Sequence, residues 1–136
     1  MSDFSKSHVS GHDNWSTPKE VYDTLDAEFH FTDDPCPLFG AENGGDGLTR
    51  EWGSSVFMNP PYSRGQMKLW CRKAYEESLK GKTVVGLLRG DTSTRWFHDW
   101  VYGKAELRFI KGRIKFGGAK TAPPFPSIIA VWRPKL

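Results

Sequence analysis

The string Asn59-Pro60-Pro61-Tyr62 follows directly after the apolar run 55–58, and this succession constrains the fold more than any other part of the sequence. The run is typical of a strand that brings the chain to the edge of a sheet. Each proline fixes its own φ and holds the residue before it in an extended conformation. The Asn59 amide oxygen and the Pro60 carbonyl oxygen are then two acceptors at fixed positions beside the Tyr62 ring. This group suits a planar base with an exocyclic amino group, whereas the alternative is a plain turn.

Predicted strands and amphipathic helices alternate along the chain. The spacing of apolar residues predicts helices over 18–29, 64–80 and 94–101, and a capping box that begins at Thr17 favours the start of the first. Strands are predicted over 29–32, 55–58, 83–88, 105–110, 113–116 and 127–132. This order predicts an α/β fold with a mainly parallel sheet and an antiparallel edge. Residues 35–53 form a Gly- and Pro-rich loop that is long for a compact domain.

Polar clusters stand at the ends of three predicted strands, at residues 33–34, 59–62 and 89–92. Ligands of α/β sheets bind beyond the carboxyl ends of the strands. The three clusters therefore predict one site at one edge of the sheet.

The length of 136 residues predicts one domain over residues 15–136, preceded by a flexible polar arm over residues 1–14. No apolar stretch is long enough to span a membrane, and the first residues lack the apolar core of a signal peptide. Cys36 and Cys71 are too few for a disulfide scaffold and lack zinc-ligand spacing. We therefore expect free thiols in a reducing cytoplasm, no membrane partner and no metal.

Charge is distributed unevenly between the two halves of the chain. Residues 1–60 hold 3 Lys or Arg against 11 Asp or Glu, and residues 61–136 hold 16 against 5. The basic excess is dense between Lys104 and Lys120, where Glu106 is the lone acid. A basic half in a small domain favours a polyanionic partner, although charged surfaces can also be simply solvated.

With these residues placed, the chain resembles the phage-type DNA N-6-adenine methyltransferases, the Dam-like family, over residues 15–132. The likeness rests on five segments in order, which are 15–18, 28–34, 59–63, 94–98 and 112–120. The resemblance implies a compact Rossmann-like domain, of phage or prophage origin, that acts in a bacterial cytoplasm. It also implies transfer of a methyl group from S-adenosylmethionine to the N-6 amino group of a flipped adenine in double-stranded DNA.

The resemblance also implies residue roles. Asn59, Pro60 and Tyr62 would be catalytic, because the two oxygens accept hydrogen bonds from the target amino group while Tyr62 stacks on the base. Cofactor contacts fall on Trp15, Thr17, Pro18, Asp34 and Asn59. Asp33 could exchange roles with Asp34, and Asp46 and Glu51 are weaker candidates for the ribose. DNA contacts fall on Pro61, Tyr62, Phe116, Arg113, Lys115 and Lys120, where the three cations would bind phosphates. Phe116 would cover the second face of the base or pack in the core.

Two departures from the family pattern leave alternatives open. No G-x-G follows Asp34, and residues 88–93 lack the proline and the later acid that the resemblance leads us to expect. One alternative is a catalytically inactive DNA-binding remnant. Another is an amino-methyltransferase that acts on RNA or on another acceptor, such as a protein amide. The sequence does not determine the recognition site or the oligomeric state.

Overall fold

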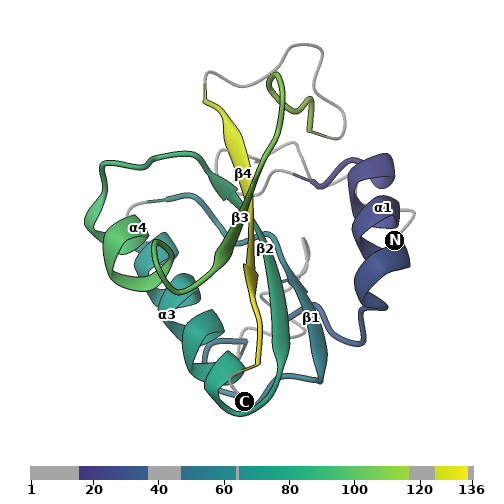
Figure 1. Ribbon diagram of the computed structural model, residues 1–136, viewed down its shortest axis with the longest axis vertical. Helices are drawn as coiled ribbons and strands as arrows, with labels where there is room; N and C mark the ends of the chain where they lie inside the picture. The colour runs from purple at the N-terminus through teal and green to yellow at the C-terminus, as the bar shows by residue number, and fades with distance from the viewer. Residues whose placement is uncertain (1–15, 37–46, 64, 117–124, 135–136) are drawn as a thin grey trace.

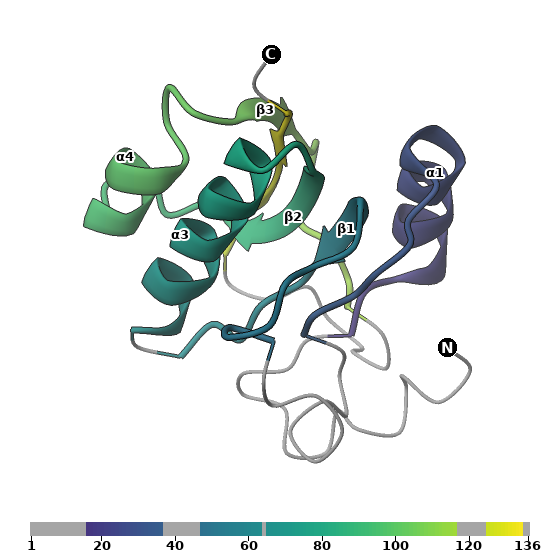
Figure 2. The same ribbon diagram turned by 90° about the horizontal axis from the view of Figure 1, so that it is seen from below.

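The computed structural model describes residues 16–36, 47–63, 65–116 and 125–134. A four-stranded sheet in the order β1-β2-β4-β3 lies between α1 on one face and α3 and α4 on the other (Figure 1, Figure 2). The elements follow the order α1 (Lys19–Phe29), β1 (Ser55–Met58), α3 (Gln66–Leu79), β2 (Thr83–Arg89), α4 (Arg95–Trp100), β3 (Glu106–Phe109) and β4 (Ser127–Trp132). Within the described residues, every helix is too short or too polar to span a membrane.

The sheet is mixed, so the prediction of an α/β fold is confirmed but that of a mainly parallel sheet is wrong. β1 and β2 form one parallel pair, whereas β4 is antiparallel to both β2 and β3. The three strands that are followed or preceded by helices, β1, β2 and β3, run in the same direction. β4 enters between β2 and β3, and this insertion replaces a parallel neighbour with two antiparallel ones.

Two predicted strands are absent from the described chain. The 29–32 strand is wrong because α1 continues to Phe29 and ends at His30, which has a left-handed φ of 53°. Only an isolated parallel bridge between Asp33 and Val56 follows, at the edge of β1. The 113–116 strand is also wrong, because this stretch is irregular although Ile114 and Phe116 are buried.

The first helix begins at Lys19, one residue later than predicted, and its predicted capping box is wrong. Pro18 occupies the N-cap and no side chain caps the helix. The Thr17 hydroxyl instead accepts a hydrogen bond from Asn59, 42 residues away in sequence. Thr94 does cap α4, because its hydroxyl accepts from the backbone N–H of Phe97.

Two hydrophobic clusters fill the spaces on either side of the sheet, as strand alternation requires. Odd positions of β1, β2 and β4, such as Phe57, Leu87 and Ile129, pack toward α1. Even positions, such as Met58, Leu88 and Ile128, pack toward α3 and α4. All six residues of β4 are buried, which explains why this antiparallel strand reads as a continuous apolar run.

A buried carboxylate ties α3 to the start of β2. The Glu77 side chain is fully buried and accepts from the backbone N–H of Trp52 and from three lysines. The lysine Nζ atoms of Lys82, Lys73 and Lys80 lie 2.8, 3.0 and 3.2 Å from its oxygens. Burial raises the pKa of Glu77, but these hydrogen bonds outweigh burial and lower it to about 2.

Candidate active site

The polar clusters meet at one edge of the sheet. β1 and β2 are parallel, so the segments that follow them, from Asn59 and from Gly90, leave at the same edge. The Asp33–Val56 bridge is also parallel, so the segment that follows it, from Asp34, leaves at that same edge.

A hydrogen-bond network fixes the amide of Asn59. Its Nδ2 donates to the Thr17 hydroxyl at 2.9 Å, and its Oδ1 accepts from the Tyr62 hydroxyl at 3.2 Å. The Tyr62 hydroxyl also lies 3.4 Å from the Leu87 carbonyl oxygen on β2. An amide oxygen has two lone pairs and so accepts up to two hydrogen bonds. The network thus orients an acceptor at the end of β1.

Aromatic side chains hold the ring of Tyr62. Phe125 and Phe116 contact it edge-on, with centroid distances of 5.5 and 6.4 Å. Burial raises the pKa of Tyr62 above its ordinary value, which keeps the phenol neutral and able to donate. Phe116 is itself 1% exposed and packs in the cluster beneath α1. Phe116 therefore supports Tyr62 from within the core, and its ring does not face solvent.

The two adjacent acids, Asp33 and Asp34, have different surroundings. Both Asp33 oxygens bind the Arg50 guanidinium, at 2.8 and 2.9 Å, and one also accepts from the N–H of Gly53. The hydrogen bonds from Arg50 outweigh partial burial and hold the pKa of Asp33 below its usual range. The Asp33 carboxylate therefore forms a structural ion pair with Arg50. Nothing in the sequence indicated Arg50 as its partner.

Asp34 carries the less neutralised carboxyl group. Within the described residues its oxygens accept one hydrogen bond, from the backbone N–H of Cys36 at 3.3 Å. Burial raises its pKa to about 7, a change that this hydrogen bond only partly opposes. Asp34 is thus half protonated near neutral pH and can gain favourable energy from a cation placed beside it.

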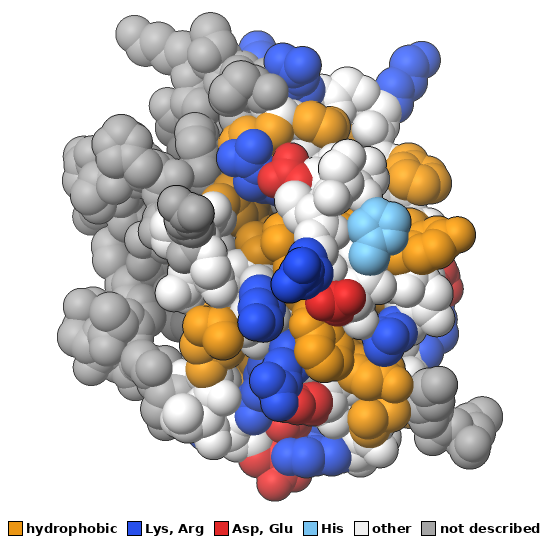
Figure 3. Space-filling model, turned by 90° about the vertical axis from the view of Figure 1, so that its left-hand side faces the viewer, with side chains coloured by type: hydrophobic (Ala, Val, Ile, Leu, Met, Phe, Trp, Pro, Cys, Tyr) orange, Lys and Arg blue, Asp and Glu red, His pale blue; other side chains and the backbone are white. Residues whose placement is uncertain are grey.

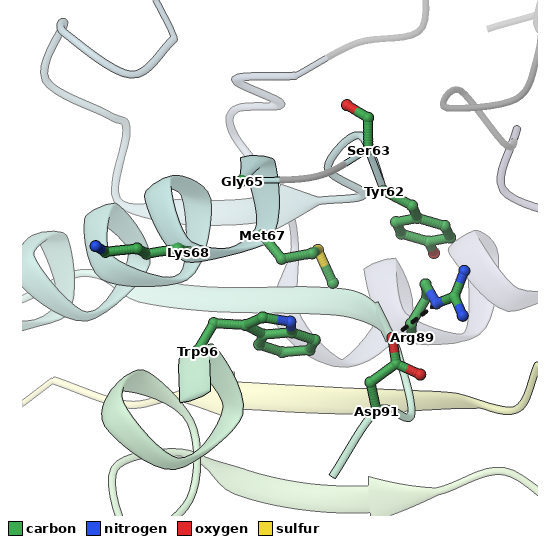
Figure 4. Close-up of a pocket in the computed structure, with 8 residues that line it drawn as sticks. All are labelled: Tyr62, Ser63, Gly65, Met67, Lys68, Arg89, Asp91 and Trp96. Atoms are coloured by element: carbon green, nitrogen blue, oxygen red, sulfur yellow. Dashed lines mark hydrogen bonds and ion pairs between the residues drawn. The ribbon is translucent and has the colours of Figure 1, made fainter. Parts of the chain in front are cut away.

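A pocket of about 250 Å³ opens beside Tyr62 (Figure 4). Arg89 and Asp91 are paired at its wall, with an Nε–Oδ2 distance of 2.8 Å, and the guanidinium lies 4.3 Å from the centre of the Phe125 ring. The other residues around the pocket come from the loop before α3, from the first turn of α3 and from α4. The full lining comprises Tyr62, Ser63, Gly65, Met67, Lys68, Arg89, Asp91 and Trp96.

Most of these pocket residues were not predicted as site residues. The available signal was the departure from the family pattern over residues 88–93, which contains both Arg89 and Asp91. The structure gives that segment a place in the wall of the pocket. Trp96 lies in the family-like segment 94–98. Met67 and Lys68 carried no comparable signal, because their positions on an amphipathic helix equally suit the core or the surface.

The remaining candidate residues are dispersed. Arg113 and Lys115 are exposed, and neither forms an ion pair within the described part of the chain. Glu51 pairs with Lys82 at 2.8 Å, at the edge of the sheet opposite Asn59. Pro18 and Pro60 are buried and Pro61 is half-buried. Trp15, Asp46 and Lys120 lie outside the described residues.

The face of the molecule formed by α3 and α4 bears many cations. Figure 3 shows Lys and Arg side chains in a band across this face, with single acidic side chains beside them. Among the described residues, no group of three His, Cys, Asp or Glu side chains is arranged to hold a metal ion.

Comparison with known proteins gives one consistent result. A family model described as DNA N-6-adenine-methyltransferase (Dam) matches residues 4–134. The DNA N-6-adenine-methyltransferase of Escherichia phage T1 is 34% identical over 111 residues, which cover 73% of this chain and 45% of the relative. That of Haemophilus phage HP1 is 35% identical over 95 residues, which cover 65% and 54%. The chain thus spans about half the length of these relatives. No solved structure gives a significant match.

Proposed function

The chain belongs to the Dam family of DNA N-6-adenine-methyltransferases, and we propose that it transfers a methyl group from S-adenosylmethionine to the N-6 amino group of an adenine in double-stranded DNA. The observation that carries the proposal is the amide of Asn59, which Thr17 and Tyr62 orient at the end of a parallel strand. We further propose that the mixed α/β sheet is a compact variant of the Rossmann-like methyltransferase fold.

Asn59 and Pro60 would act on the target amino group by accepting hydrogen bonds from its two N–H groups. The lone pair of that nitrogen is delocalised into the purine ring, and two fixed acceptors favour a pyramidal nitrogen with a more available lone pair. This effect is preorganised electrostatics and positioning. Bound S-adenosylmethionine would supply a methyl group on a sulfonium, whose sulfur would be released as a neutral thioether. The new N–C bond would replace the S–C bond, and the methylated amino group would lose one proton to solvent.

The pocket beside Tyr62 would receive the flipped adenine. Its volume of about 250 Å³ is large enough for one purine, and aromatic and apolar side chains line much of it. Tyr62 would stack on one face of the base, with Pro61 at the entrance. Phe116 would act indirectly, because it fixes the tilt of the Tyr62 ring.

Thr17, Pro18, Asp34 and Asn59 would hold the cofactor on the other side of the Asn59 amide. The Asp34 carboxylate, whose charge burial disfavours, would be stabilised by a ligand that carries an ammonium and a sulfonium. Trp15 would complete this group from outside the described residues.

Cofactor affinity is expected to rise with pH through the titration of Asp34. Its pKa of about 7 lies above the ordinary value of 3.8, so ionisation of Asp34 destabilises the unliganded fold as the pH rises from about 4 to about 7. A bound cation would stabilise the ionised carboxylate, and the affinity for the cofactor should therefore increase roughly tenfold between pH 6 and pH 8. Calorimetry with S-adenosylmethionine measures this directly. Asp34→Asn should bind weakly with no such rise, whereas an equal rise in the variant would remove Asp34 from the cofactor site.

DNA affinity is expected to depend on salt through Arg113 and Lys115. Each cation that contacts a phosphate contributes about one unit to the slope of log affinity against log salt concentration. Arg113→Gln and Lys115→Gln should each reduce that slope by about one unit. Fluorescence anisotropy of a labelled duplex between about 50 and about 200 mM salt tests this. Lys19→Gln on α1 is the control, and equal slopes in all four proteins would place the DNA elsewhere.

The same reaction on a different acceptor is distinguished by a competition assay. Labelled methyl transfer is measured with duplex DNA, RNA and a glutamine-containing peptide together, and we expect the label in DNA. Label in RNA or in the peptide would mean that the protein carries out the same methyl transfer on that acceptor instead of DNA. If the chain binds DNA but calorimetry detects no S-adenosylmethionine binding, it is an inactive DNA-binding remnant.

A further inference from the structure

Phe109 stands at the end of β3 with its ring in solvent. Its side chain is 77% exposed, more than any other large apolar residue that the structure describes. Single exposed apolar side chains are common on protein surfaces and need no explanation by themselves. The position of Phe109 and the charges that follow it are the features that indicate a role.

The strand register places Phe109 on the same face and at the same end of the sheet as the proposed base pocket. Phe109 pairs with Ile128 on β4, and Ile128 pairs with Leu88 on β2. Residues directly opposite on neighbouring strands point to the same face, which here is the face of α3 and α4. Two strand spacings separate Phe109 from Leu88, or about 10 Å. Met67 and Trp96, which pack on that same face, line the pocket.

Exposed basic side chains follow Phe109 in the chain, starting at Lys111. Arg108, which precedes it, is held by two hydrogen bonds to Glu28 and one to Glu106. By contrast, Lys111, Arg113 and Lys115 are exposed and form no ion pair with any described residue. The ring thus lies between a neutralised arginine and three cations that are available to phosphates.

We propose that Phe109 inserts into the DNA base stack and fills the space that the flipped adenine leaves. This inference rests on the proposed function, because it requires an extruded base. Extrusion costs the stacking and pairing of the target nucleotide, and an apolar ring in the gap restores part of the stacking. The cations at 111–115 would hold the backbone on either side of the opened step.

The proposal is tested with two duplexes that differ in the cost of extrusion. In the first, the target adenine pairs with thymine, and in the second it faces an abasic site and is already unpaired. Phe109→Ala should lower kcat/KM by roughly tenfold or more on the first duplex and by less than about threefold on the second. Tyr102→Ala is the matched control, because Tyr102 is also a highly exposed aromatic residue, and it should leave both values unchanged.

A fluorescent base at the target position gives a readout besides turnover. With 2-aminopurine there, the wild type should increase the fluorescence of the paired duplex, and Phe109→Ala should increase it less. Equal losses on both duplexes would contradict the insertion of Phe109 into the base stack and would make Phe109 a general binding or folding residue. A wild-type dimer that Phe109→Ala converts to a monomer in sedimentation would assign the ring to a contact between copies. Absence of methyl transfer by the wild type to either duplex would contradict the proposed function and, with it, the insertion of Phe109.

Discussion

Replacing Asn59 with alanine is expected to lower the rate of methyl transfer by about 100- to 1,000-fold, the range for loss of one preorganised hydrogen-bonding group. The variant removes the side-chain acceptor and leaves the Pro60 carbonyl alone to orient the amino group. It also removes the hydrogen bonds to Thr17 and from Tyr62, which should cost the fold about 1–2 kcal/mol. The measurement is single-turnover transfer with the cofactor and DNA both saturating.

Two matched variants separate the acceptor from the network that holds it. Thr17→Val removes the partner of Nδ2 but keeps the Asn59 oxygen, so we expect a loss of about tenfold or less. Asn59→Asp keeps an accepting oxygen and should be less impaired than Asn59→Ala. Wild-type turnover in Asn59→Ala would contradict the assigned role. An equal loss in Thr17→Val and Asn59→Ala would show that the orientation of the Asn59 amide, and not its oxygen as an acceptor, determines the rate.

Replacing Glu77 with glutamine is expected to lower the free energy of unfolding by about 3 kcal/mol. Glu77 is 0% exposed, and its removal as an anion leaves Lys73 without a counter-charge and Lys82 with Glu51 alone. Both lysine side chains are largely buried, at 11% and 13% exposure. Urea unfolding followed by tryptophan fluorescence measures the change. Glu76→Gln is the control, because Glu76 forms an exposed pair with Arg72 and should contribute less than about 0.5 kcal/mol.

The same variant is expected to change the acid sensitivity of the fold. The folded pKa of Glu77 is about 2, below its ordinary value of 4.5. Its contribution to stability is therefore complete above about pH 4.5 and is lost as the pH falls from there toward 2. Stability differences between wild type and Glu77→Gln should shrink over that interval. A difference that stays constant down to pH 2 would show that Glu77 does not act through its charge.

Local patterns predicted most of the fold. The helical spacing of Met67, Trp70 and Ala74 predicted α3 to within two residues at its start, and the apolar runs gave β1, β2 and β4. Strand order was not predictable in the same way, because the insertion of β4 between β2 and β3 depends on pairings between residues 19 to 48 positions apart in sequence. The buried but irregular stretch at Ile114 and Phe116 shows a second limit, since alternation of apolar residues also occurs without a partner strand.

The candidate site was predictable where chemistry is local to a motif. The segment 59–62 indicated its own acceptors and ring, and its position at the end of β1 matches that expectation. Pairings across the chain were not accessible, as Thr17 with Asn59 and Asp33 with Arg50 show. Both pairs join residues whose side chains have strong local alternatives, a helix cap in one case and solvent in the other.

The most direct test is transfer of labelled methyl from S-adenosylmethionine to unmethylated duplex DNA, followed by nucleoside analysis of the digest. We predict N-6-methyladenine with the wild-type protein, and a rate lower by at least about 100-fold with Asn59→Ala. Cofactor binding without any methylated adenine would contradict the proposed reaction.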